Sequence, residues 1–149
     1  MRKTCLFALL LLPFFVSAQN ADSVWFVSHY TKKEVTIPMR DGIKLFTSIY
    51  LPKDKAEKHP ILMERTPYSC RPYGSEYLPF WRTHLMQYCK EQYIMVIQDV
   101  RGRWMSEGEF VDVRPFNPNK KTKQDIDEST DGYDTIDWMV KNLENNNGN

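Results

Sequence analysis

Residues 93–108 read Tyr93-Ile-Met-Val-Ile-Gln-Asp-Val-Arg-Gly-Arg-Trp-Met-Ser-Glu-Gly108. The first half is a short, nearly unbroken apolar run, and it ends abruptly in charged residues and glycine. Such a run is typical of a strand that is buried on both faces, as in a parallel sheet. Open α/β sheets carry their binding and catalytic residues outside the carboxyl ends of the strands. The stretch therefore predicts a central strand of an α/β fold, followed by a loop in the position where such folds place their chemistry.

Upstream of this strand, two alternating segments predict a β-hairpin. Apolar and polar side chains alternate over residues 35–39, and the same period of two continues over residues 43–51. Between them lies Asp41-Gly42, a dipeptide that tolerates positive φ in a tight hairpin turn. Because proline cannot donate a hydrogen bond to a ladder, Pro38 favours an edge position for the first strand. Residues 21–33, before the hairpin, are expected to form a lead-in with exposed aromatic side chains.

The segment between the hairpin and the central strand predicts a crossover. Residues 61–64 form another short apolar run, and residues 79–91 carry apolar side chains at helical spacing without an internal glycine. Pro79 suits the first turn of a helix. A helix here would connect the two strands as a right-handed crossover and make them parallel. An antiparallel hairpin followed by parallel strands with helices predicts the α/β class.

A last helix is predicted near the carboxyl end of the chain. Residues 127–131 offer capping side chains and first-turn acids that suit the helix dipole. The expected apolar face consists of Tyr133, Ile136, Met139, Val140 and Leu143, and Gly132 is its weak point. The asparagine-rich residues 145–149 form a turn with no element after it. We therefore expect the chain to stop short of a complete sheet.

The amino terminus predicts export. Arg2 and Lys3 precede the apolar run Leu6–Val16, and small residues surround a cleavage position after Ala18. This pattern predicts a signal peptide over residues 1–18 and a mature chain over residues 19–149, periplasmic or secreted. The alternative is a membrane anchor, for which the apolar run is short. We expect no membrane association after cleavage.

Composition excludes several function classes. The chain has 149 residues, enough for one domain at most, and a formal net charge of +1. A near-neutral balance gives no electrostatic reason to expect a nucleic-acid partner. The three histidines are scattered and match no zinc-site spacing, so no metal or cofactor is predicted. Cys70 and Cys89 remain in the mature chain, and two separate semi-buried thiols are favoured over a disulfide between them.

Candidate catalytic residues are few. The chain contains no Gly-x-Ser-x-Gly nucleophile elbow, and Ser106 lacks the required glycine spacing. No Ser-His-acid triad is evident. Asp99 and Arg101, at the end of the central strand, are interpreted as structural support for the loop. Trp104 could form the wall of a substrate pocket or simply pack, and the sequence does not decide between these roles.

Tyr68 is the one residue with a specific catalytic interpretation. Pro67 favours an extended conformation at Thr66, so a rigid turn presents Tyr68 at the carboxyl end of the strand that begins at Ile61. In α/β-hydrolases, one oxyanion-hole donor comes from the loop after the third strand. A phenol there could donate a hydrogen bond to a developing oxyanion. The alternative is a tyrosine that packs its ring on the rim of the fold, and position alone weighs the two equally.

Three motifs carry a family resemblance. Residues 65–68 (Arg-Thr-Pro-Tyr), residues 98–110 (beginning Gln-Asp-Val-Arg-Gly) and residues 127–138 (ending Ile-Asp-Trp) resemble, in order and spacing, one group of hydrolases. This group is the cocaine-esterase and α-amino-acid ester hydrolase family, related to X-Pro dipeptidyl-peptidase serine hydrolases. The resemblance covers nearly all of the mature chain. It implies the amino-terminal part of an α/β-hydrolase fold whose members have a Ser-His-Asp triad, a helical cap and a jelly-roll domain.

The resemblance also implies function. Such enzymes cleave esters or amides of small acyl groups, including α-amino-acid esters, or remove X-Pro dipeptides, and their oxyanion tyrosine falls on Tyr68. The nucleophile elbow of the family follows the asparagine-rich turn, so the triad is expected outside residues 1–149. Two hypotheses follow. The chain is the amino-terminal fragment of a secreted serine hydrolase, with the rest of that hydrolase as its partner, or it is a truncated non-catalytic α/β module with at most a binding role.

Overall fold

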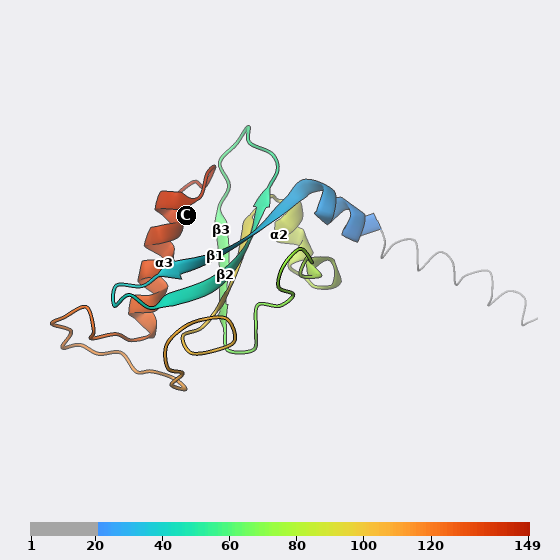
Figure 1. Cartoon of the computed structure of the whole chain (residues 1–149). Helices are drawn as coiled ribbons and strands as arrows, with labels where there is room; N and C mark the ends of the chain where they lie inside the picture. The colour runs from blue at the N-terminus through green and yellow to red at the C-terminus, as the bar shows by residue number, and fades with distance from the viewer. Residues whose placement is uncertain (1–20) are drawn as a thin grey trace, which may run out of the picture.

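The computed structural model describes residues 21–149, so the predicted signal peptide lies outside the described residues. A four-stranded sheet with the order β1-β2-β4-β3 forms the centre of the fold (Figure 1). Its strands are β1 (Tyr30–Pro38), β2 (Lys44–Pro52), β3 (Ile61–Thr66) and β4 (Ile94–Asp99). The helical elements are η1 (Phe80–Arg82), α2 (Met86–Lys90) and α3 (Glu128–Asn142). None of the helices within residues 21–149 is long and apolar enough to cross a bilayer.

The predicted central strand is confirmed as β4. All six of its residues are buried, and it pairs antiparallel with β2 and parallel with β3. In the parallel register Ile61 lies beside Ile94 and Thr66 lies beside Asp99. The carboxyl ends of β3 and β4 therefore meet at one edge of the sheet, and the loops that follow them are neighbours.

The predicted hairpin is also confirmed. β1 and β2 pair antiparallel along their whole length, and β1 is the outer strand, as Pro38 indicated. The turn is closed by hydrogen bonds between the backbones of Met39 and Ile43 at 2.8 Å and of Gly42 and Met39 at 2.9 Å. Gly42 has a φ of +92°, a conformation that glycine adopts without steric penalty.

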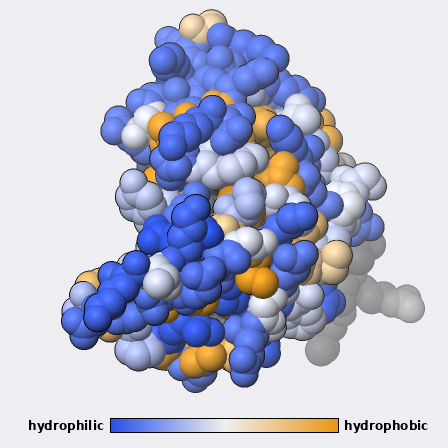
Figure 2. Space-filling view, turned by 60° about the vertical axis from the view of Figure 1, so that its left-hand side comes forward, coloured by the Kyte–Doolittle hydropathy of each residue, from blue (hydrophilic) through white to orange (hydrophobic). Residues whose placement is uncertain are grey.

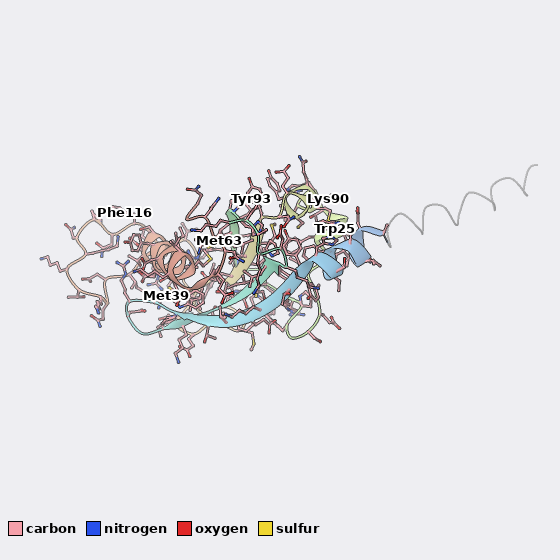
Figure 3. All side chains as sticks on the ribbon, turned by 90° about the horizontal axis from the view of Figure 1, so that it is seen from above. Trp25, Met39, Met63, Lys90, Tyr93 and Phe116 are labelled. Carbon is pink, nitrogen blue, oxygen red and sulfur yellow. The ribbon has the colours of Figure 1, made fainter. Side chains whose placement is uncertain are left out.

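Each face of the sheet is covered by its own apolar core. On one face α3 packs Met139 and Leu143 against the sheet, together with Ile94 and Val96. On the other face α2 and the helical residues 21–29 enclose an aromatic cluster around Phe26. Figure 3 shows these two layers, with α3 and the loop of Phe116 on one side and Lys90 of α2 on the other.

Two sequence predictions about the second face are wrong. Residues 21–33 do not form a lead-in with exposed aromatics, because a helix over residues 21–29 turns Phe26 inward, where its ring stacks on Tyr30 at 4.6 Å. The predicted helix over residues 79–91 is divided into η1 and α2. The division falls at Thr83, which has an extended backbone (φ −130°, ψ 167°) and binds Phe80 and Leu85 through its hydroxyl group.

α3 begins where predicted but presents a different face to the sheet. Asp127 caps it, because its carboxylate accepts a hydrogen bond from the Thr130 amide at 2.8 Å while the Thr130 hydroxyl accepts one from the Asp127 amide. Three residues of the predicted apolar face are exposed: Tyr133, Ile136 and Val140. Asp131 and Thr135 are buried in their place. The helix is rotated because these polar groups bind polar residues of β4 and its loop, as described below.

Both cysteines of residues 21–149 are buried free thiols. The favoured hypothesis of two separate thiols is therefore confirmed. Burial raises the pKa of the Cys70 thiol to about 12 and that of the Cys89 thiol to about 12. Both thiols stay protonated at neutral pH and serve as apolar core residues.

Candidate active site at the carboxyl ends of β3 and β4

The structure places Tyr68 in the loop directly after β3, at the edge of the sheet where β3 and β4 end. Its backbone amide donates to the Thr66 hydroxyl at 3.1 Å, which closes the turn after Pro67. The residue is 85% exposed, so its ring does not pack on the rim of the described residues as the alternative interpretation required. The phenol hydroxyl is free to meet a group bound above this edge.

The loop after β4 holds the backbone next to Tyr68. The Pro67 carbonyl accepts hydrogen bonds from the indole Nε1 of Trp104 at 2.9 Å and from Arg103 Nε at 3.2 Å. Trp104 is 49% exposed, and its ring lies 4.8 Å from the guanidinium carbon of Arg71. The packing interpretation of Trp104 is therefore confirmed, and its role as a pocket wall stays a prediction. Trp104 packs through its indole nitrogen and presents part of its ring to the surface near Tyr68.

Asp99 and Arg101 have separate structural roles. The Asp99 carboxylate accepts from the Cys70 amide at 2.7 Å and from the Tyr73 hydroxyl at 3.0 Å. Arg101 instead forms ion pairs with Asp41 and Asp131, each at 2.7 Å. Burial alone would lower the pKa of the Arg101 guanidinium, but hydrogen bonds and charge from the two aspartates raise it. The pair supports the loops, as interpreted from sequence, without contacts between its two members.

A polar network beneath these loops was missed by the sequence analysis. Gln98 is fully buried and donates through Nε2 to the hydroxyls of Thr47 and Thr135, both at 3.0 Å. Its Oε1 accepts from Arg65 Nε at 2.9 Å. A buried polar residue inside an otherwise apolar strand was the one available signal, because such a group needs partners. The partner residues are too far away in sequence to leave a local pattern.

Ser106 is engaged in support of the fold. Its hydroxyl donates to the Asp99 carbonyl at 2.7 Å and accepts from the Phe46 amide at 2.8 Å. A serine nucleophile needs a free hydroxyl beside a general base. Ser106 has neither, which agrees with its unsuitable spacing in sequence. Within residues 21–149 there is also no group of three His, Cys, Asp or Glu side chains suited to a metal ion.

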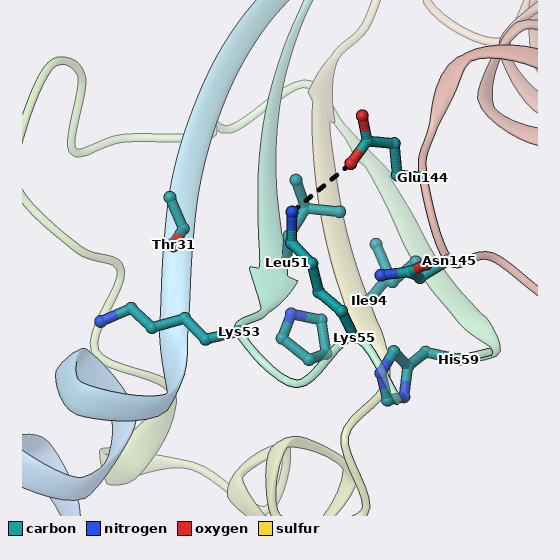
Figure 4. Close-up of a pocket in the computed structure, with 9 residues that line it drawn as sticks. Thr31, Leu51, Lys53, Lys55, His59, Ile94, Glu144 and Asn145 are labelled. Carbon is teal, nitrogen blue, oxygen red and sulfur yellow. Dashed lines mark ion pairs between the residues drawn. The ribbon is translucent and has the colours of Figure 1, made fainter. Parts of the chain in front are cut away.

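A cavity of about 230 Å³ lies at the opposite end of the sheet (Figure 4). It is lined by the carboxyl end of β2 and by Ile94, the first residue of β4, with His59 and Asn145 at its side. Its rim carries an ion pair between Lys55 and Glu144 at 3.6 Å, both of which are exposed. Because Tyr68 follows the carboxyl end of β3, this cavity is separate from the candidate active site.

The sheet order, the antiparallel start and the loop of Tyr68 define the amino-terminal part of a hydrolase fold. Residues 41–149 match the model of the X-Pro dipeptidyl-peptidase (S15) family, and the chain belongs to this family. The resemblance found in the sequence is thereby confirmed. The family and its named relatives are peptide and ester hydrolases.

Three relatives show how much of such a protein the chain represents. The chain is 33% identical over 107 residues to cocaine esterase of Rhodococcus sp. (strain MB1 Bresler), which is 72% of this chain and 16% of that protein. An α-amino acid ester hydrolase structure matches with a TM-score of 0.67 and 41% identity, over 80% of this chain and 20% of its own. An aminopeptidase structure from a marine sediment Thaumarchaeota archaeon matches with a TM-score of 0.66 and 40% identity, over 80% of this chain and 20% of its own. The chain thus spans no more than 20% of these relatives.

The ion pairs of Arg101 yield a stability prediction. Arg101→Met removes the ion pairs of Asp41 and Asp131 with Arg101. Asp131, whose side chain is only 3% exposed, then keeps only the longer ion pair with Arg65 at 3.8 Å. Removal of one partner of a buried ion pair lowers the free energy of unfolding by about 3–5 kcal/mol. The matched control is Arg40→Met, whose pair with Asp134 is more exposed, so we expect a smaller loss. Urea denaturation followed by circular dichroism measures both, and equal losses would contradict the structural role given to Arg101.

Proposed function

We propose that this chain is the amino-terminal part of an exported serine hydrolase that cleaves esters or amides of small acyl groups by acyl transfer. Its substrates are α-amino-acid esters, or peptides from which it removes X-Pro dipeptides, the classes for which the family and its relatives are named. The observation that carries the proposal is Tyr68, whose backbone is held at the carboxyl end of β3 while its side chain is exposed.

In this proposal Tyr68 acts as an oxyanion donor. Attack of a serine on the substrate carbonyl places negative charge on the carbonyl oxygen in the tetrahedral intermediate. A phenol O–H is a hydrogen-bond donor, and one placed against that oxygen stabilises the transition state more than the ground state. Loss of one such donor typically raises the barrier by about 2.7–4 kcal/mol. The serine, its histidine and its acid lie outside residues 1–149.

The backbone at the end of the chain supports this arrangement. Residues 145–149 run parallel to the start of β3, with hydrogen bonds from the His59 amide to Asn145 at 2.7 Å and from the Ile61 amide to Asn149 at 2.8 Å. A polypeptide that continues in this direction follows the outer edge of β3 towards Tyr68. A nucleophile in the turn after such a strand would lie near the loop of Tyr68.

The alternative of a non-catalytic module is less well supported. β3 is the outer strand on its side of the sheet, so a module would leave a parallel edge open to aggregation. α3 also exposes apolar side chains, Ile136 by 50% and Val140 by 41%. Apolar areas lie between hydrophilic ones on the face that Figure 2 presents. Both surfaces are more easily explained by further polypeptide than by an independent module.

The reading frame supplies the most direct test. We expect it to continue past Asn149 into an apolar strand and a Gly-x-Ser-x-Gly elbow, because the relatives are about five times as long as the matched region. Sequencing of the coding DNA beyond Asn149 decides this. A stop codon at that point would favour the non-catalytic module.

In the full hydrolase, we expect Tyr68→Phe to lower kcat roughly a hundredfold on an activated ester, with little change in KM, because the donor acts in the transition state. Steady-state kinetics with p-nitrophenyl esters measure this. The matched control is Tyr88→Phe, because Tyr88 is a partly exposed tyrosine on α2, near the start of β4 and away from the candidate site. An unchanged kcat for Tyr68→Phe would remove Tyr68 from the mechanism.

Export is tested by the mature amino terminus. When the protein is produced with its own leader, we expect mass spectrometry of the exported form to find Gln19 as the first residue. Ala18→Arg should block this cleavage, because signal peptidase requires a small residue before the cut. A protein that remains in the cell with residues 1–18 attached would argue against export.

A further inference from the structure

We propose that Asp99 is the positioning residue for Tyr68, an inference that rests on the proposed oxyanion role of Tyr68. Asp99 is the last residue of β4 and is fully buried. It lies beside Thr66, the last residue of β3, in the parallel register. Its carboxylate therefore lies next to the start of the Tyr68 loop, where this loop leaves the sheet.

The Asp99 carboxylate connects the two loops at this edge. Oδ1 accepts from the Cys70 amide at 2.7 Å, and Oδ2 accepts from the Tyr73 hydroxyl at 3.0 Å and from the Met105 amide at 3.3 Å. No ion pair within 4.0 Å joins Asp99 to another residue in the part of the chain that the structure describes. A buried carboxylate without a cation requires such donors. The structure satisfies it with groups from the loops after β3 and β4.

A second anchor holds the other side of Tyr68. The Pro67 carbonyl is bound by Trp104 and Arg103, and the Asp99 carbonyl is bound by Ser106. Tyr68 and Ser69 thus span two fixed points, one at Pro67 and one at Cys70. The backbone around the phenol is set before any substrate arrives, which is the condition under which an oxyanion donor is effective.

The backbone conformation of Ser69 indicates that the segment between the two anchors is strained. Its φ is +98°, a conformation that residues other than glycine rarely adopt and that costs about 1–3 kcal/mol. Such a conformation persists only where the surroundings enforce it. The anchors at Pro67 and Cys70 lie on either side of Tyr68 and Ser69. Without the carboxylate, Ser69 can relax and Tyr68 moves with it.

A double-mutant cycle in the full hydrolase tests the inference. Asp99→Asn is nearly isosteric but replaces one acceptor oxygen by a donor, so we expect kcat to fall at least about tenfold with little change in KM. In a Tyr68→Phe background the same substitution should have almost no further effect, because there is no phenol left to position. A fall of equal size in both backgrounds would overturn the positioning role. If Tyr68→Phe alone leaves kcat unchanged, the proposed oxyanion role of Tyr68 fails instead.

Amide hydrogen exchange of the full hydrolase provides a test without catalysis. Asp99→Asn should accelerate exchange at the Cys70 amide and through residues 67–74, whereas Asp112→Asn, at an exposed loop aspartate, should not. Where Asp99→Asn does not fold, Tyr73→Phe serves in its place. It removes only the phenol contacts to Asp99 and Ser69 and should accelerate exchange in the same residues. Unchanged exchange in the variant that folds would overturn the inference.

Discussion

At the carboxyl end of β4, Gln98 and Asp99 are fully buried and Arg101 is only 5% exposed. Polar groups removed from water must find partners, since each unsatisfied one costs about 1–3 kcal/mol. The chain supplies them from every neighbouring element. Gln98 binds β2, β3 and α3, Arg101 binds the hairpin turn and α3, and Asp99 binds the loop of Tyr68. The positions of these elements relative to one another follow from this requirement.

The same requirement decides the orientation of α3. The face that a helix buries is determined by the total free energy of its contacts, and the burial of apolar area is only one contribution to this total. Burial of Ile136 and Val140 would expose Asp131 and Thr135, and would separate Arg101 from Asp131 and Gln98 from Thr135. The loss of a buried carboxylate partner by the Arg101 guanidinium is more unfavourable than two exposed aliphatic side chains. The polar face therefore turns inward, and part of the apolar face remains at the surface.

The sequence was informative where interactions are local. Alternation, the Asp41-Gly42 turn and the apolar run before Asp99 predicted the hairpin and the parallel pair of strands, and Pro67 predicted the turn at Tyr68. The sequence predictions were wrong where the conformation of a segment depends on a partner that is distant in sequence. The face of α3 depends on β4, and the inward turn of Phe26 depends on Tyr30 and the aromatic cluster beneath it. The hydrogen bond from the Cys70 amide to the Asp99 carboxylate joins residues 29 positions apart, and no sequence pattern predicts it.

The ordered conformation of the Tyr68 loop requires unfavourable contributions to the free energy, although the loop buries little side-chain surface. It depends on a buried carboxylate that lacks a cation among the described residues, on a positive φ at Ser69 and on two donors aimed at one carbonyl. Tyr68, which these features hold, is 85% exposed, so they do not serve the packing of the core. An oxyanion donor would benefit from them, because its effect on the transition state depends on a fixed position. The rigid backbone of this loop is therefore what the proposed oxyanion role of Tyr68 requires.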